Sequence, residues 1–360
     1  MTPKDLYFIL EQGIKAPSAD NLQPWKFEIQ ENGSVYLILD ASKITSYCDA
    51  GNLAPYIAAG AAIENMRVAA TRTGHETLCR YFPDPSDPLR VAHLYFKPGL
   101  GGESRHLLCL EKRHTNRKFY DTSKSVDRSD LSALERFAPR EEGFRLLWKT
   151  RSDAGYRELA NVIGESDQLR FEIKRLHQEL MQVIRFDETS AQETRDGLPL
   201  PALEAGPSAP LMFPLIRSWN RLNWLNRIGM SLSFNLYARF QMLSSAAAGL
   251  LVSEGSSPYD FVRGGEIMER IWLETCLHGL ALQPMEALPI FLINTAVTGG
   301  PDLNARQKLK VDNLGSAFRR IYGVGPQNGL ILFFRIGYAA PPEHRSASSD
   351  KAAFRPMRPP

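Results

Sequence analysis

The chain has 360 residues, of which 43% are hydrophobic and 23% charged, and its formal net charge is +3. This composition is ordinary for a globular protein, the length accommodates two modules, and the small charge gives no basis for nucleic-acid binding. No run of apolar residues is long enough to span a bilayer. Four scattered cysteines without a C-x-x-C pair favour a reducing compartment and no zinc site (Cys48, Cys79, Cys109 and Cys276). With no N-terminal signal pattern, we expect a cytoplasmic protein with no membrane or nucleic-acid partner.

The first part of the chain predicts short helices and strands in alternation. Leu6, Ile9 and Leu10 lie at helical spacing, and a Glu-Asn-Gly turn joins two strand-like runs. A long alanine-rich helix ends near Gly74, which is a suitable C-cap. The predicted elements are helix 3–15, hairpin 26–40, helix 54–74, strands 78–82 and 91–98, and helix 104–113.

After residue 120 a similar order of elements begins again. A helix with an Asp/Ser start is followed by a strand, a long helical region and further strands. The predicted elements are helix 125–139, strand 144–150, helical region 153–183, strand 247–254, helix 258–284, strand 288–294, helix 302–321 and strand 329–339.

Two glycine pairs indicate an internal repeat. Gly60 and Gly74 are as far apart as Gly265 and Gly279, and a glutamate follows the first glycine of each pair by four residues. Both pairs bracket a predicted helix, and the surrounding elements recur in the same order. Chance similarity between two buried helices is the alternative, and we interpret the pattern as a duplication.

Residues 186–248 have no counterpart in the first half. They begin polar and then become apolar and aromatic, with Trp219 and Trp224 among arginines and asparagines. This pattern predicts a helical lid that buries one face. Residues 341–360 are rich in Pro, Ser, Ala and Arg and are expected to form a tail or an arm.

The stretch "KRHTNRKF" places Arg113 and Arg117 four residues apart with Thr115 between them. Planar guanidinium groups match the oxygens of a phosphate in pairs, and a hydroxyl adds a further donor. A basic cluster of this kind is also typical of a solvated surface, so the motif alone does not decide between the two.

Two further stretches have small polar groups next to prolines. In "PSADNLQPW", Ser18 and Asn21 have the side chains of caps and turn formers, yet an amide also suits the edge of a heteroaromatic ring. In "LALQPMEALP", a turn around Pro284 presents backbone N–H groups without any side-chain signature. Two arginines, Arg345 and Arg355, follow the last strand.

Together, "APSADNLQPWKF", "KRHTNRKF", "GLALQPMEAL" and the arginines after "RIGYA" resemble the nitroreductase superfamily of FMN-dependent enzymes. An ordinary member has an α+β fold and forms a homodimer that binds FMN at its interface. Here the Ser-Asn bend belongs to the first module and the Arg motif opens the second, so each half keeps what the other has lost.

The resemblance is to long single-chain members associated with actinobacterial dormancy regulons. It implies an α+β, nitroreductase-like fold in which two tandem modules form an intramolecular pseudo-dimer with one composite flavin site. The implied divisions are a first module 1–112, a second module 113–340 with a lid insertion at about 186–248, and a tail 341–360.

The resemblance also implies residue roles. The FMN phosphate and ribityl chain are expected on Arg113, Thr115 and Arg117, with Arg345 or Arg355 closing on the phosphate. The flavin ring is expected against Pro284, Glu286 and Ala287, with the Glu286 backbone N–H near N5. Further expected contacts are Ser18 and Asn21 from the opposite module, Arg185 at the pyrimidine edge, and Trp219 and Trp224 as a lid over the substrate face.

Because the flavin carries the chemistry in this family, the resemblance implies no catalytic side chain and no metal. The implied function is a two-electron oxidoreductase that uses NAD(P)H or a small organic substrate. Three alternatives stay open: an FMN-sequestering protein with little turnover, a flavin-dependent oxidase or dehydrogenase of a small metabolite, and a homologue without cofactor. A fused pseudo-dimer already buries the usual interface, so we expect a monomer, with a homodimer as the alternative.

Overall fold

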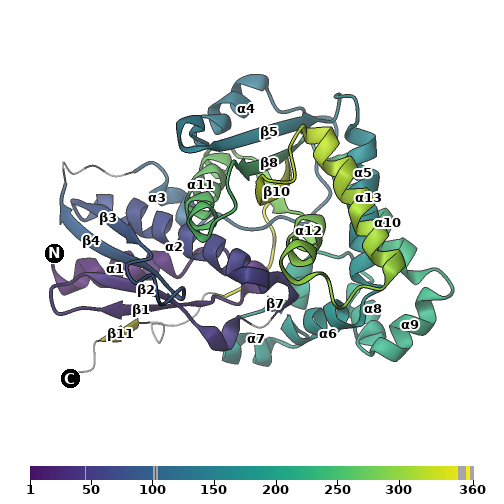
Figure 1. Cartoon of the computed structure of the whole chain (residues 1–360), viewed down its shortest axis with the longest axis horizontal. Helices are drawn as coiled ribbons and strands as arrows, with labels where there is room; N and C mark the ends of the chain where they lie inside the picture. Colours follow the sequence, from purple (N-terminus) through teal and green to yellow (C-terminus); the bar gives the residue numbers. More distant parts are fainter. Residues whose placement is uncertain (45, 100–101, 103, 348–353, 357–360) are drawn as a thin grey trace.

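The computed structural model of the chain describes residues 1–44, 46–99, 102, 104–347 and 354–356. Helices and strands are mixed, with two main sheets, which confirms the predicted α+β class. Figure 1 shows these sheets in different parts of the molecule, with helices α2 (Leu53–Arg72) and α11 (Pro258–Leu277) between them. The centre of the molecule is therefore a helix pair rather than a sheet.

The first sheet is built from the N-terminal quarter of the chain and one strand of the tail. Its order is β11-β1-β2-β4-β3, and its strands are β1 (Trp25–Ile29), β2 (Val35–Leu39), β3 (His75–Tyr81), β4 (Arg90–Pro98) and β11 (Phe354–Pro356). β11 pairs parallel to β1 with Phe354 opposite Phe27, whereas the other pairs are antiparallel. The predicted tail thus returns to the first sheet as an edge strand.

The second sheet has the order β5-β8-β10-β9 and is antiparallel throughout; its strands are β5 (Phe144–Thr150), β8 (Ala247–Ser253), β9 (Ala281–Pro284) and β10 (Gly329–Gly337). When the strands are matched in chain order, this order is the same as β1-β2-β4-β3 of the first sheet. In each half the long helix also follows the second strand. This is the topology that a duplicated unit produces.

The remaining helices cover the sheets and form the insertion. Along the two halves they are α1 (Pro3–Gly13), α3 (Leu107–Leu110), α4 (Arg128–Glu135), α5 (Tyr156–Arg170), α12 (Ala287–Thr298) and α13 (Ala305–Tyr322). Those of the insertion and the segment before it are α6 (Lys174–Val183), α7 (Glu188–Thr194), α8 (Ala209–Ile216), α9 (Trp219–Asn226) and α10 (Met230–Ser244). Two short strands, β6 (Ile184–Arg185) and β7 (Leu198–Pro199), pair where the insertion begins.

Two predicted elements near the end of the second half are wrong. Residues 288–294 were expected as a strand but form the first part of helix α12. Periodicity cannot separate a short apolar run in a strand from one in a buried helix, and here both sides of the helix meet apolar neighbours. The predicted helix 258–284 ends at Leu277, because Gly279 has a φ of 66° and reverses the chain into strand β9.

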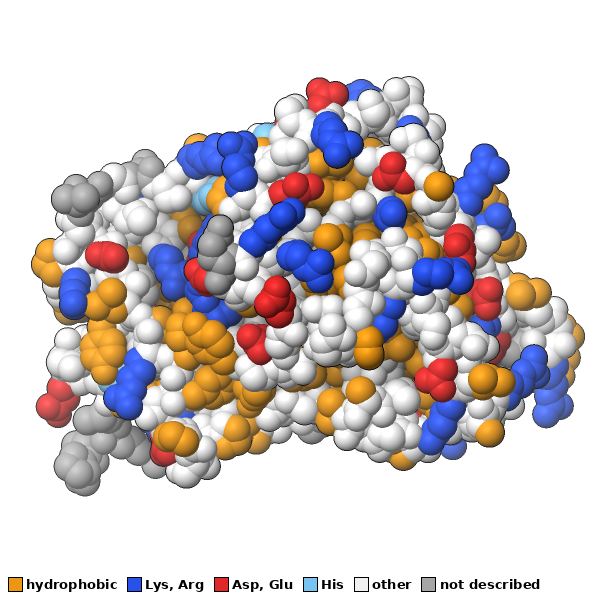
Figure 2. Space-filling view, turned by 45° about the horizontal axis from the view of Figure 1, so that its top comes forward, with side chains coloured by type: hydrophobic (Ala, Val, Ile, Leu, Met, Phe, Trp, Pro, Cys, Tyr) orange, Lys and Arg blue, Asp and Glu red, His pale blue; other side chains and the backbone are white. Residues whose placement is uncertain are grey.

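The surface carries both signs of charge. Figure 2 shows Lys and Arg interspersed with Asp and Glu over the visible face. Within the described ranges, no helix combines the length and apolar character needed to cross a membrane.

Helices α2 and α11 cross at two glycines. A Cβ atom on Gly60 would lie 1.9 Å from the carbonyl oxygen of Val262, and one on Gly265 would lie 2.1 Å from that of Ile57. The two contacts are reciprocal, because each glycine meets the residue three positions before the other. Only glycine permits this approach, so the repeated glycines of the sequence mark the helix crossing.

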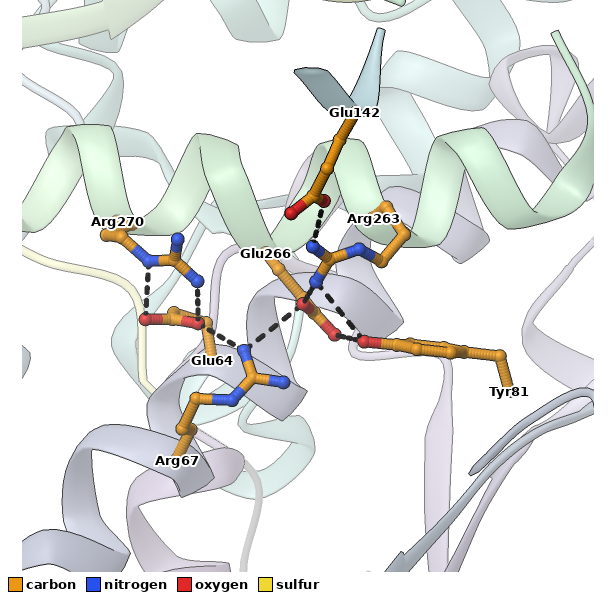
Figure 3. Close-up of polar contacts among 7 residues, drawn as sticks. All are labelled: Glu64, Arg67, Tyr81, Glu142, Arg263, Glu266 and Arg270. Atoms are coloured by element: carbon orange, nitrogen blue, oxygen red, sulfur yellow. Dashed lines mark hydrogen bonds and ion pairs between the residues drawn. The ribbon is translucent and has the colours of Figure 1, made fainter. Parts of the chain in front are cut away.

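A network of ion pairs runs along the same crossing (Figure 3). Glu64 accepts two hydrogen bonds from Arg270 at 2.9 and 2.8 Å, and Arg67 bridges Glu64 and Glu266 at 2.7 and 3.1 Å. The Tyr81 hydroxyl donates to Glu266 at 2.6 Å. Both glutamates are buried, and breaking one such pair leaves an uncompensated buried charge. The network therefore fixes the relative position of the two halves.

Candidate functional site

A cavity of about 520 Å³ lies where the first half, the second half and the insertion meet. Its walls come from the bend at 17–20, from Thr115 and Arg117, from the turn at 283–287, from α5, and from α8 and α10. The volume lies in the range of small-molecule and cofactor sites. Three stretches that the sequence singled out are therefore brought to one place.

The bend after α1 is a strained piece of backbone. Asp20, Asn21 and Gln23 have φ angles of 48°, 55° and 51°, and none of them is glycine. Each such residue costs on the order of 1–3 kcal/mol, and strain of this kind gathers at functional sites. The Ser18 hydroxyl accepts the Gln23 N–H at 2.9 Å and holds the bend closed, while Ser18 and Asp20 line the cavity.

The two amide side chains of the bend point elsewhere. Asn21 Nδ2 donates to the carbonyls of Gly197 at 3.2 Å and Ala347 at 2.9 Å. Gln23 Nε2 donates to the carbonyl of Arg195 at 2.9 Å. Asn21 thus ties the insertion and the tail to the bend, and its side chain does not line the cavity.

In the arginine motif, Thr115 and Arg117 line the cavity. The Arg117 guanidinium donates to the Ala202 carbonyl at 3.0 Å, and its backbone N–H donates to Glu204 Oε2 at 2.8 Å. Burial lowers the pKa of Arg117, although an arginine keeps its charge under all ordinary conditions. One half-buried cation of the motif is thus available at the cavity wall.

Arg113 lies outside the cavity lining. Its Nε is 2.9 Å from Glu269 Oε1, and its Nη2 donates to the Lys15 carbonyl at 2.8 Å. Its guanidinium also lies 4.8 Å from the ring centre of Trp272, and that ring does line the cavity. Burial raises the pKa of the Glu269 carboxyl to about 7. In this structure Arg113 therefore neutralises a buried glutamate behind the cavity wall.

The turn between β9 and α12 contributes Pro284, Glu286 and Ala287 to the lining. Because α12 begins at Ala287, the N–H groups of Ala287 and Leu288 have no acceptor within the helix, whereas the Ile290 N–H donates to the Glu286 carbonyl at 3.0 Å. Glu286 Oε1 accepts the Phe333 N–H at 2.5 Å, and no cation among the described residues pairs with it. Burial raises the pKa of Glu286 to about 8, so this carboxyl is largely neutral at neutral pH.

Helix α5 supplies two charged residues that the sequence analysis missed. Asp167 and Arg170 are three residues apart, so both side chains fall on the helix side that lines the cavity. Within the described part of the chain neither forms a hydrogen bond or an ion pair within 4 Å. Burial raises the pKa of Asp167 to about 6. Burial acts to lower the pKa of Arg170, but the carboxylates of Asp20 and Asp167 raise it.

Arg170 is thus a cation inside the cavity without a direct partner in the described chain. No sequence signal marked it, because "GESDQLRF" has the pattern of an ordinary solvated helix.

The insertion covers the cavity with α8 and α10. Its lining side chains include Phe213, Phe234 and Tyr237, and the Phe234 ring stacks on Phe171 with centroids 3.6 Å apart. Part of the segment predicted as a lid therefore contributes to the cavity wall.

The two predicted lid tryptophans lie elsewhere. Trp219 packs near His177, with ring centroids 5.6 Å apart, and Trp224 is 59% exposed on the outside. Neither lines the cavity. Their helix, α9, packs against α8 and α10, and those two helices supply lining side chains.

Two predicted arginines, Arg185 and Arg345, also lie away from the cavity lining. Arg185 donates to the Gln182 carbonyl and pairs with Asp196, so it fixes the short β6–β7 region. Arg345 donates to the Glu111 carbonyl at 2.9 Å. The backbone of Arg355 lies in β11, and its side chain is outside what the structure describes.

Comparison with known proteins finds no family model that matches the chain. An uncharacterised protein of Mycobacterium tuberculosis is 28% identical over 345 residues, which cover 93% of this chain and 46% of that protein. The "Putative NAD(P)H nitroreductase acg" of the same species is 33% identical over 89 residues, which cover 25% of this chain and 27% of that protein. The chain thus spans less than half the length of these curated relatives.

One similar solved structure is a nitroreductase with bound FMN from Bacteroides fragilis. It is 13% identical to this chain, the alignment covers 69% of this chain and 96% of that chain, and the TM-score is 0.35. The FMN-dependent nitroreductase NfnB of Mycobacterium smegmatis, in complex with NADPH, has 14% identity, coverages of 68% and 93%, and a TM-score of 0.37. The functional names that these matches carry are those of nitroreductases.

Proposed function

We propose that the protein is an FMN-binding flavoprotein of the nitroreductase type that acts as a two-electron oxidoreductase. The observation that carries the proposal is the meeting of Ser18 from the first half with Thr115 and Arg117 from the second half in one cavity. These residues come from the two motifs that resemble the family, which are about a hundred residues apart in the chain. One composite site then binds one FMN per chain.

The cavity residues fit this cofactor. Its walls are mostly apolar and include Trp272 and Phe234, which suits a flat aromatic ring system. Arg117 and Arg170 are cations that suit phosphate or anionic oxygen, and hydroxyls of Ser18 and Thr115 suit the ribityl chain. Bound FMN supplies the redox chemistry.

The start of α12 is the proposed contact for the flavin ring. Pro284, Glu286 and Ala287 form this wall, and helix N–H groups there favour negative charge. Because Glu286 is neutral at neutral pH, it places no anion beside such charge. The hydride donor, NAD(P)H or a small organic substrate, is proposed to bind in the rest of the same cavity.

Some of the predicted FMN contacts lie outside the cavity lining. They remain proposals that require these side chains to leave their present partners. Arg113 and Arg345 would reach a phosphate only by leaving Glu269 and the Glu111 carbonyl. Asn21 and Arg185 are likewise engaged in holding the insertion in place.

We also propose that the two halves are a fused pseudo-dimer. The equal strand order of the two sheets and the reciprocal contacts of Gly60 and Gly265 support it.

Titration of the purified protein with FMN tests the proposal. Arg117→Ala should weaken FMN binding by about 10- to 100-fold, since a hydrogen bond to a charged group contributes about 1.5–3 kcal/mol. Arg136→Ala, which removes an exposed arginine outside the cavity, is the matched control and should leave affinity unchanged. Equal FMN affinity in Arg117→Ala and the control would reject the site.

The alternatives are distinguished on the FMN-loaded protein. A turnover enzyme loses its visible flavin absorbance when NADH or NADPH is added, whereas a storage protein responds only to dithionite. Oxygen-dependent formation of product without a nicotinamide would instead indicate an oxidase. Residues of the insertion form part of the cavity wall. This observation favours FMN storage as the second candidate function, because such a wall can restrict access to the flavin.

A further inference from the structure

The insertion exposes a run of large apolar side chains to solvent. They are between 46% and 81% exposed, and we call them the lid face: Leu211 and Leu215 of α8, Trp224 and Ile228 at α9, and Leu232, Leu236 and Phe240 of α10. Within each helix these residues are four apart, so they lie on one side of it. Single exposed apolar residues need no explanation, but a set gathered on three consecutive helices does.

The opposite sides of α8 and α10 are apolar too. Phe213 on α8 and Phe234 on α10 line the cavity, and each lies two residues after a leucine of the lid face, Leu211 and Leu232. The inner side of these helices is thus accounted for by the cavity. Nothing in the described chain covers the outer side.

The charge of this segment has one sign. Between Ala205 and Ser253 the sequence holds no Asp or Glu, while it holds Arg217, Arg221 and Arg227 next to the lid face. All three arginines are exposed, and none forms an ion pair with a described residue. Figure 2 shows basic and hydrophobic side chains together at the right-hand tip, the end where α9 lies in Figure 1.

The cavity opens beside the same face. Ser208 and Ser233 both line the cavity and are exposed to solvent, so the cavity reaches the surface between the starts of α8 and α10. Leu211 and Leu232 flank this opening along the chain. The opening of the cavity therefore lies next to apolar residues of the lid face.

We propose that the lid face docks on a membrane surface that contains anionic lipids. Exposed leucines, an exposed tryptophan and unpaired arginines, without any carboxylate, are the side chains that such an interface binds. Long arginine side chains can keep their charge at the headgroups while their stems lie along the apolar layer. Peripheral docking of this kind needs no membrane-spanning helix.

A second copy of the chain is the competing occupant. It would bring Arg221 and Arg227 of one copy against the same arginines of the other, and residues 205–253 hold no carboxylate to pair with them. Like charges at an interface oppose association, so this occupant is disfavoured.

Co-sedimentation of the full chain with vesicles tests the proposal. We expect binding to phosphatidylcholine vesicles that contain phosphatidylglycerol, at least about tenfold weaker binding to pure phosphatidylcholine, and weakening by salt. Leu232→Glu with Leu236→Glu should lower binding by at least about tenfold, since it adds anions and removes apolar contact. The control Leu309→Glu changes a 61% exposed leucine of α13 and should bind as the unchanged protein does.

Tryptophan fluorescence adds a local readout. Vesicle binding should shift the emission of Trp224 to shorter wavelength, and Trp224→Phe should remove the shift. No vesicle binding, or equal loss in the Leu309→Glu control, would overturn the proposal. A dimer in light scattering that Leu232→Glu with Leu236→Glu dissolves, without vesicle binding, would assign the lid face to a second copy instead. None of these outcomes depends on bound FMN.

Discussion

Single residues of the arginine motif have different roles although they are neighbours in the chain. Arg117 lines the cavity, whereas Arg113 pairs with the buried Glu269. Removing Arg113 would leave a buried carboxyl without its cation, which typically costs several kcal/mol of stability. Loss of FMN from an Arg113 variant would therefore not identify a phosphate contact, and Arg117 is the better residue to test.

Glu286 makes stability depend on pH. Burial raises its pKa in the folded protein to about 8, above the ordinary 4.5, so the folded state holds a proton that the unfolded chain releases. This contribution is fully present below pH 4.5 and is lost as pH rises toward 8. Glu286→Gln keeps an acceptor for the Phe333 N–H and does not titrate. We expect the decline in unfolding free energy between pH 5 and 8.5 to be smaller by about 1–3 kcal/mol in this variant.

Urea unfolding at a series of pH values measures this difference. The exposed Glu135→Gln serves as the control and should follow the unchanged protein. Parallel profiles for Glu286→Gln and the unchanged protein would contradict the role of Glu286.

At the scale of elements, the α2–α11 crossing is the most constrained part of the fold. Gly60→Ala would place a methyl group 1.9 Å from the Val262 carbonyl oxygen, so the helices must separate. We expect a loss of about 3 kcal/mol or more in unfolding free energy. Gly74→Ala is the comparison. A Cβ atom at Gly74 would meet nothing within 4 Å, so this substitution costs only the strain of a φ of 73°, about 1–2 kcal/mol.

Urea unfolding of both variants decides the point. If Gly60→Ala were no less stable than Gly74→Ala, the close approach of the helices would not exist in solution.

The sequence predicts most elements well where their pattern is long or bounded by turns. The hairpin around Asn32-Gly33 and strand β5 have the predicted places. Helix α12 was predicted as a strand because a short apolar run such as residues 288–293 has no period of its own. The break before β9 needed the positive φ of Gly279, which sequence alone does not reveal.

The residues of the candidate site were predictable only in part, because the fold, and not the local sequence, decides which side chains face the cavity. Motif residues such as Ser18 and Thr115 stand out by composition and spacing. Arg170 and Asp167 do not, because their importance comes from facing a cavity rather than solvent. The outward position of Asn21 follows from carbonyls of Gly197 and Ala347, which are far away in the chain.

At the scale of the whole molecule, the tail closes the structure on its own beginning. β11 pairs with β1, and the Ala347 carbonyl accepts the side chain of Asn21 in the strained bend. Deleting residues 342–360 removes both contacts. We expect a loss of about 2–4 kcal/mol in unfolding free energy, and weaker FMN binding because the bend is less well held.

Thermal unfolding and FMN titration of the truncated chain measure these effects. A truncated chain as stable as the full one would show that the tail does not hold the bend.

The glycine crossing has one more consequence. In an assembly of two separate subunits, such a contact weakens as the protein is diluted, because each half must find its partner again. Here Gly60 and Gly265 belong to one polypeptide, so the local concentration of one helix around the other is set by the connecting chain. The cavity between the halves therefore persists at any cellular abundance, and a few molecules per cell suffice to keep it assembled.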